Sequence, residues 1–267
     1  MFKAGIIQYS GRDYDFITTC NWTSTGTFTL QAFRGSETNV VNSHTIYYRK
    51  KGTSTWSSTT NGKIVISSTG EWEVANDWNK SGNNVLTHSY CWITAINQVT
   101  DVYFNKSTLG TTIGNYFLYF CWNNCSSLTS MPVGFNLPSG ITTVGDYFLG
   151  NCWDNCSSLT SMPVGFNLPS GITTVGNFFL GYCWYYCSSI TSMPVGFNLP
   201  SGITSVGDYF LYACWYGCTN LKADAYTKNI TFEFSAKNVF GGTCPISPDS
   251  VTASKSSPVN VAVNRTL

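Results

Sequence analysis

The chain holds 11 cysteines, enough to bind a metal ion or to form several disulfides. Eight of them form four Cys-x-x-x-Cys pairs, from Cys121/Cys125 to Cys214/Cys218. Zinc sites usually have Cys-x-x-Cys spacing or include histidine, and the two histidines, His44 and His88, lie outside these pairs. Disulfides form in oxidising compartments, and an odd number of cysteines leaves one over. We therefore favour buried, reduced thiols that pack as small apolar side chains, with disulfides as the alternative and no metal or cofactor expected.

Two carboxylates have a spacing that could support glycoside hydrolysis. Glu71 and Glu73 share one face of a predicted strand, and glycosidases use a pair of carboxyl groups that flank the bond they cleave. A solvated strand face explains the same spacing more simply. The sequence has no Ser/His/Asp order, no glycine loop for phosphate and no His-Glu-x-x-His motif. We predict no catalytic residue and keep a carbohydrate-active enzyme as an alternative hypothesis.

The cysteine pairs belong to a unit of 31 residues that is repeated almost without change. Read from Gly140 the unit is GITTVGDYFLGNCWDNCSSLTSMPVGFNLPS, and the other copies start at Gly110, Gly171 and Gly202. A Cys-Trp dipeptide recurs in every copy, at Cys121, Cys152, Cys183 and Cys214, and a looser copy precedes them at Cys91. A fixed period of this length predicts a solenoid, in which each copy contacts its neighbours.

Each repeat is predicted to contain one short helix. Asp146 precedes an apolar run and suits a helix N-cap, as do its equivalents Asn115, Asn177 and Asp208. Apolar residues then recur at helical spacing over about three turns. They are Phe148, Leu149, Cys152, Trp153 and Cys156. The remainder of the unit contains two prolines and predicts an extended path, with short strands that pair between copies.

Two sets of side chains on this predicted helix are candidates for binding. The first set is Trp122, Trp153, Trp184 and Trp215. These lie on the apolar side, so we favour a buried ladder over a stacking platform for sugars or bases. The second set occupies four positions that differ sharply between copies and are expected to face away from the core. Its members are Tyr119, Phe120, Asn123, Asn124, Gly150, Asn151, Asp154, Asn155, Gly181, Tyr182, Tyr185, Tyr186, Tyr212, Ala213, Tyr216 and Gly217.

The composition of the second set predicts a binding strip. Tyrosine, asparagine, glycine and aspartate dominate it, much as in an antibody paratope, where tyrosine supplies rigid area and small polar residues adapt. Ordinary drift at exposed positions is the alternative interpretation. We predict that the strip contacts a partner, which is either a neighbouring protein subunit or a protein or glycan on the host surface.

Segments such as LPSGITTVGDYFL and CSSLTSM carry a family signature. In the copy that starts at Leu168, it consists of Leu168-Pro169, Ile172, Val175 and Phe179, followed by Cys187. These residues resemble the BspA-type leucine-rich repeat of microbial surface proteins, over about residues 87–244. The segment MPVGFN and about one additional helical turn make the period longer than that of the family. The resemblance implies a leucine-rich-repeat fold and a role in adhesion and partner binding rather than catalysis.

The chain is expected to have three parts. Residues 1–86 contain short segments of alternating polarity between turn signals, typical of an immunoglobulin- or fibronectin-like β-sandwich. The candidate strands are AGIIQYS, YDFITTC, GTFTLQAFR, HTIYYRK, GKIVISS and GEWEVAN. Residues 87–244 are predicted to form the solenoid, and residues 245–267 a C-terminal tail or docking strand. The predicted fold class is therefore mainly β with short helices, an N-terminal β-sandwich followed by a leucine-rich-repeat-type solenoid.

Composition narrows the function. Only 10% of residues are charged and the formal net charge is +1, which argues against nucleic-acid binding. The sequence predicts no membrane span and no secretory signal, because it contains no long apolar run and no basic start followed by an apolar core. We expect a non-enzymatic structural or adhesion protein that forms part of an assembly on a virion, or at the cell surface. A phage-type decoration or tail/fibre protein that contacts the host or neighbouring subunits is the first hypothesis, and a microbial BspA-like cell-surface adhesin is the second.

Overall fold

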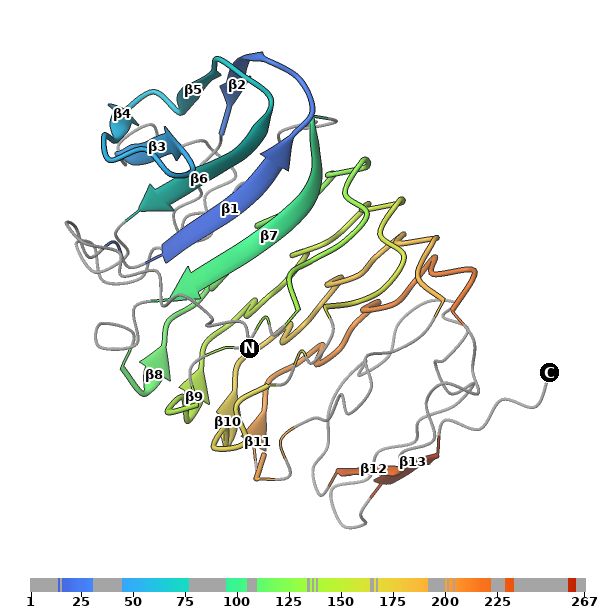
Figure 1. Cartoon of the computed structure of the whole chain (residues 1–267). Helices are drawn as coiled ribbons and strands as arrows, with labels where there is room; N and C mark the ends of the chain where they lie inside the picture. The colour runs from blue at the N-terminus through green and yellow to red at the C-terminus, as the bar shows by residue number, and fades with distance from the viewer. Residues whose placement is uncertain are drawn as a thin grey trace, which may run out of the picture.

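The structure, a computed structural model, consists of strands and turns (Figure 1). It describes residues 14, 16–30, 45–76, 95–104, 110–133, 135, 137, 139–163, 166, 168–191, 200, 202–203, 205–221, 229–232 and 259–262. The predicted mainly β class is confirmed for this part of the chain. The candidate strand at residues 4–10, both histidines, Cys91 and Cys244 lie outside the described residues.

The N-terminal part is built on a five-stranded antiparallel sheet with the strand order β4-β3-β6-β1-β7. The strands are Ser57–Thr59 (β4), Ile46–Lys50 (β3), Gly70–Asn76 (β6), Phe16–Trp22 (β1) and Ile96–Phe104 (β7). A separate antiparallel ribbon pairs Gly26–Thr29 (β2) with Lys63–Ile66 (β5). Strands β1, β2, β3, β5 and β6 overlap the segments whose alternation predicted them, whereas no pattern predicted β4 or β7.

Strand β7 joins this sheet to the repeats. It pairs with β1 in antiparallel register, Phe16 lying opposite Phe104. Its Val99 N–H also donates a hydrogen bond to the Ser130 carbonyl, at 3.2 Å. As a result, one hydrophobic core continues from Phe16 in β1 to Leu221 in the last described repeat. The domain boundary predicted between residues 86 and 87 falls outside the described residues.

Equivalent residues of successive repeats lie side by side. The short strands Thr112–Ile113 (β8), Thr143–Val144 (β9), Thr174–Val175 (β10) and Ser205–Val206 (β11) form a parallel sheet. Each residue pairs with the one 31 positions later, as Thr143 does with Thr174. Figure 1 shows these strands along one edge of a series of layered turns, coloured green to orange. Near the C-terminus, Asn229–Phe232 (β12) pairs antiparallel with Val259–Ala262 (β13). Strand β13 lies in the segment predicted as a tail or docking strand, and β12 lies in the segment predicted as solenoid.

The predicted helix is wrong, because the segment from Asp146 to Cys156 and its copies form consecutive turns. The backbone donors alternate: Cys152 donates its N–H to the Leu149 carbonyl of the same copy at 3.3 Å, and Trp153 donates to the Cys183 carbonyl of the next copy at 2.8 Å. An α-helix would use both donors internally. Packed helices also lie about 8–10 Å apart, whereas stacked side chains of adjacent copies, such as Trp153 and Trp184, have ring centroids 5.3 Å apart.

The residues predicted as helix N-caps form a ladder between copies instead. Asn115 Oδ1 accepts a hydrogen bond from the Asp146 N–H at 2.9 Å. Asp146 Oδ1 accepts one from the Asn177 N–H, and Asn177 Oδ1 accepts one from the Asp208 N–H, both at 2.7 Å. The short polar side chain is required here because it reaches the next copy, not because it caps a helix.

The tryptophans form the predicted buried ladder, so they are not a stacking platform. Trp122, Trp153 and Trp184 have no exposed surface, and Trp215 is 5% exposed. Their rings stack nearly parallel, with successive centroids 5.5, 5.3 and 6.0 Å apart. Phe166 contacts the Trp153 and Trp184 rings edge-on, with centroids 6.0 Å apart in both cases. This interdigitation fills the core between these two tryptophans.

Candidate binding surface

Half-buried aromatic side chains form one connected network on the repeats, which we call the aromatic network. Its central column consists of Tyr116, Tyr147, Phe178 and Tyr209, one ring from each copy. Successive rings in this column stack with centroids 5.1, 4.8 and 4.6 Å apart. Ring contacts extend the network to Tyr119, Phe120, Tyr182, Tyr185, Tyr186, Tyr212 and Tyr216. The most exposed of these rings belongs to Tyr186, which is 43% exposed.

The structure brings the predicted binding strip together but buries part of it. Four of its residues, Asn123, Gly150, Gly181 and Ala213, are buried, so the expectation that all of them face away from the core is wrong. The expectation rested on helical angles, and the segment is not a helix. The other members are half-buried or exposed: Tyr119, Phe120, Asn124, Asn151, Asp154, Asn155, Tyr182, Tyr185, Tyr186, Tyr212, Tyr216 and Gly217.

Two glycines of the strip make room for tyrosine rings of the preceding copy. A Cβ atom on Gly150 would lie 3.1 Å from Tyr119 Cδ2, which is closer than ordinary contact. A Cβ atom on Gly217 would collide with the Tyr186 ring. At these two steps, a glycine is therefore present because it leaves room for a tyrosine ring of the preceding copy.

Backbone conformation explains a further part of the composition. Asn124, Asn155, Tyr186 and Gly217 occupy equivalent positions, and all have positive φ, at 57°, 58°, 53° and 76°. Asparagine and glycine tolerate this left-handed region better than other residues. The frequency of asparagine and glycine in the strip is therefore not by itself a sign of binding. The tyrosines are the residues that indicate a binding surface.

Sequence reasoning missed the central column of the aromatic network. Its members sit directly after the Asn/Asp ladder residue, at a position that is tyrosine or phenylalanine in every copy. The predicted strip was chosen from positions that differ between copies, so it left out a position that is aromatic in every copy. An aromatic residue next to a polar ladder residue in each copy is the signal that could have identified it.

Asp154 is a half-buried carboxyl within the strip. Its Oδ2 accepts a hydrogen bond from Asn123 Nδ2 at 2.9 Å, whereas its Oδ1 is buried without a hydrogen-bond partner in the described part of the chain. Burial raises the pKa of Asp154 to about 7, against the lowering effect of the Asn123 hydrogen bond. The equivalent residue of the next copy is Tyr185, whose pKa is raised to about 12, mainly by burial. The surface therefore contains a carboxyl that changes charge near neutral pH.

The eight thiols of the repeats are buried, as predicted, and the structure joins none of them in a disulfide. Cys156, Cys187 and Cys218 each donate a hydrogen bond to the tryptophan carbonyl of the preceding copy, at 3.0, 2.9 and 3.0 Å. Burial raises the pKa of Cys152 and Cys183 well above the ordinary value. Metals bind the thiolate, which this environment disfavours. Within the described ranges, no three His, Cys, Asp or Glu side chains are placed to hold a metal ion.

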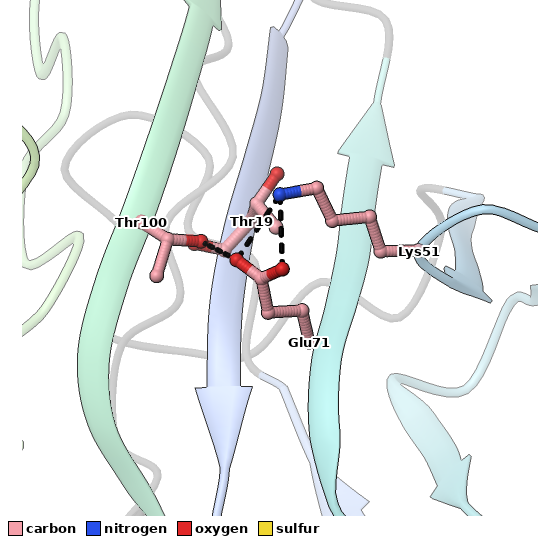
Figure 2. Close-up of polar contacts among 4 residues, drawn as sticks. All are labelled: Thr19, Lys51, Glu71 and Thr100. Carbon is pink, nitrogen blue, oxygen red and sulfur yellow. Dashed lines mark hydrogen bonds and ion pairs between the residues drawn. The ribbon is translucent and has the colours of Figure 1, made fainter.

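The two candidate glycosidase carboxylates are engaged in ion pairs. Figure 2 shows Glu71 between Lys51 and Thr100: Lys51 Nζ lies 3.0 Å from Glu71 Oε2, and Thr100 Oγ1 donates to Glu71 Oε1 at 2.5 Å. The Thr100 hydrogen bond, followed by Lys51, lowers the pKa of Glu71. Glu73 is 3% exposed and pairs with Arg49 Nε at 2.5 Å. Both side chains therefore have structural partners that hold them on the sheet.

Comparison with known proteins adds no relative. No protein-family model matches the chain, and no match was found among curated proteins or solved structures. The resemblance to BspA-type repeats thus rests on the sequence motifs. In the residues that the structure describes, no helix is long and apolar enough to cross a membrane.

Proposed function

We propose that this chain is a non-enzymatic structural or adhesion protein that binds a partner through the aromatic network of its repeats. The repeats are proposed to form a leucine-rich-repeat-type solenoid of the BspA-like kind, following an N-terminal β-sandwich. The regular pairing of residues 31 positions apart supports the solenoid. The five-stranded sheet and the β2-β5 ribbon, which bury residues in one core, support the sandwich.

The observation that carries the proposal is the connected network of half-buried rings. Tyrosine and phenylalanine are normally packed more completely in a core, and an extended aromatic surface on a soluble chain is typical of an interaction site. Tyrosine also combines a large apolar area with a hydroxyl group at low entropic cost, which is why it is enriched in binding surfaces. The tryptophan column and the phenylalanine columns beside it are buried, whereas the tyrosines of the network keep part of their surface exposed to a partner.

Two settings use this surface in the same way. In a phage-type virion, as a decoration or tail/fibre protein, it contacts the host surface or a neighbouring subunit. In a microbial cell-surface adhesin, it contacts a host molecule. The low charge and polar, aromatic composition suit both, and we place the virion first.

A carbohydrate-active enzyme is the third and least supported reading. Hydrolysis needs a general acid, a carboxyl group whose pKa is raised. The pKa of Glu71 is lowered, and Glu73 is tied to Arg49.

Photo-crosslinking on the native particle or cell surface tests the proposed function. We expect a photoreactive p-benzoylphenylalanine at position 186 to form an adduct with the partner, because Tyr186 is the most exposed ring of the network. The same probe at Thr142, an exposed position at the edge of β9, serves as the matched control and is expected to form none.

A variant test complements the adduct. Replacing Tyr182, Tyr185, Tyr186 and Tyr216 together by serine is expected to weaken attachment or assembly while the tryptophan fluorescence of the folded chain is retained. If this variant loses the folded signal, Tyr186→Ser alone provides the test. Unchanged attachment, together with no adduct at position 186, would show that the differences between copies are ordinary sequence drift at exposed positions.

A further inference from the structure

We infer that the aromatic network binds an extended, uncharged polysaccharide that lies along the direction in which the repeats stack. This inference rests on the proposed binding role of the network and names its ligand class. It depends on the charge of the repeats, on their spacing and on the groups they present.

The charge of the repeats disfavours anionic ligands. Residues 110–221 contain no lysine, arginine, histidine or glutamate, and their charged residues are Asp146, Asp154 and Asp208. All 14 lysines and arginines lie elsewhere in the chain. Nucleic acids, phosphate headgroups and sulfated or uronic polysaccharides require cations to offset their charge, and here they would meet only carboxylates. The ligand is therefore uncharged or weakly cationic.

The spacing of the repeats favours a ligand that repeats at the same interval. Stacked rings in the central column are 4.6–5.1 Å apart, and Tyr185 and Tyr216 stack at 5.1 Å. Sugar rings of an extended, β-linked polysaccharide follow one another at a similar interval, so each copy can meet one sugar. An extended peptide presents equivalent side chains every ~6.6 Å, two residues of about 3.3 Å each. Because this interval is longer than the separation of the rings, the peptide side chains no longer coincide with the rings by the second copy.

The groups on the surface match the chemistry of sugars. Sugars present hydroxyl groups that both donate and accept hydrogen bonds, together with apolar C–H edges. Tyrosine hydroxyls and asparagine amides donate and accept in the same way. The rings of the central column stack face to face, so their outer edges offer the apolar surface that a ligand along the stack would contact. Asn151 is half-buried and Asn155 is exposed, and both lie on the same run of turns as Tyr147 of the central column. A polar partner is thus available beside the rings at this step.

Affinity electrophoresis of the full chain tests the inference. The gels contain hydroxyethyl cellulose, galactomannan or glycol chitin as uncharged probes, and heparin or polygalacturonate as anionic probes. We expect at least one uncharged polysaccharide to retard the chain and neither anionic probe to do so. The Tyr182/Tyr185/Tyr186/Tyr216→Ser variant is expected to bind at least tenfold more weakly. The matched control, alanine at Thr111, Thr142, Thr173 and Thr174, changes exposed residues of the same repeats and is expected to bind normally.

Oligosaccharide length adds an independent readout. A ligand that spans several copies gains contacts with each sugar, so a hexasaccharide of the retarding polymer is expected to bind at least tenfold more tightly than the disaccharide. Tyr186→Ser alone is expected to lower hexasaccharide affinity several-fold if the quadruple variant does not fold.

The electrophoresis and crosslinking results together separate the polysaccharide inference from the proposed binding function. No retardation by any uncharged probe, retardation by an anionic probe alone, or equal affinity for short and long oligosaccharides overturns the polysaccharide inference. If the adduct at position 186 is then a protein, the proposed binding function stands and its ligand class is wrong. If there is neither retardation nor an adduct, both proposals fall.

Discussion

The carboxyl of Asp154 is expected to make the folded chain less stable as pH rises through neutrality. Its pKa is raised from 3.8 to about 7 by burial, so between these values the folded state holds a proton that the unfolded chain has released. Stability therefore falls as pH rises from about 4 to about 7 and then levels off, the opposite of a carboxylate in an ion pair. Between pH 5 and pH 8 this group alone costs about 2–3 kcal/mol of unfolding free energy.

Urea unfolding of Asp154→Asn and the natural chain, followed by tryptophan fluorescence at pH 5 and pH 8, measures this effect. Asparagine is neutral at both pH values and can still accept the hydrogen bond from Asn123, which joins Asn123 Nδ2 to Asp154 Oδ2 at 2.9 Å. We expect the variant to gain about 2–3 kcal/mol relative to the natural chain on going from pH 5 to pH 8. Asp208→Asn, which removes an exposed carboxylate, controls for the loss of one negative charge. If the stability difference between Asp154→Asn and the natural chain is the same at both pH values, the carboxyl is not desolvated and the reasoning fails.

Two further predictions concern the interior and the backbone of the repeats. Cys152 and Cys183 are buried with strongly raised pKa values, so alkylation of the native chain is expected to leave their thiols unmodified even at pH 9, and to modify them in denaturant; mass spectrometry that finds them oxidised to disulfides in unreduced protein contradicts this. Asn155 has a φ of 58°, so Asn155→Val is expected to lower the unfolding free energy by about 1–2 kcal/mol, whereas Asn155→Gly should change it by less than about 0.5 kcal/mol. Urea denaturation measures the unfolding free energy of both Asn155 variants, and equal values would show that Asn155 does not keep its left-handed backbone conformation.

The sequence by itself determined the period of the repeats, most of the described N-terminal strands and the identity of the core residues. A near-identical unit must place equivalent side chains in equivalent surroundings, so the pairing of Thr143 with Thr174 follows from counting. Cysteine and tryptophan recurring at one interval predict buried ladders, and Trp153 and Cys152 are indeed fully buried. Alternating polarity predicts strands because successive side chains point to opposite faces.

Tertiary structure decided what the segment between those ladders becomes. Apolar residues at Phe148, Leu149, Cys152, Trp153 and Cys156 have helical spacing, and all of them are buried. Consecutive turns bury the same positions, so spacing cannot separate the two conformations. The separation between copies distinguishes the two conformations. Equivalent side chains stack 5.3–5.5 Å apart, which is closer than adjacent helices can pack. At this separation, the backbone N–H groups donate alternately to carbonyls of the same copy and of a neighbouring copy.

The residues exposed on the candidate binding surface also depend on whether this segment forms a helix or consecutive turns. Positions chosen by helical angle included residues such as Asn123 that are buried, and omitted the stacked column that contains Tyr147 and Phe178. The room that Gly150 leaves for Tyr119, the hydrogen bond from Asn123 to Asp154 and the hydrogen bond from the Asn155 N–H to the Tyr185 carbonyl are all contacts between copies. No local pattern encodes such contacts, because each one joins residues about 31 positions apart whose distance is set only when the copies stack.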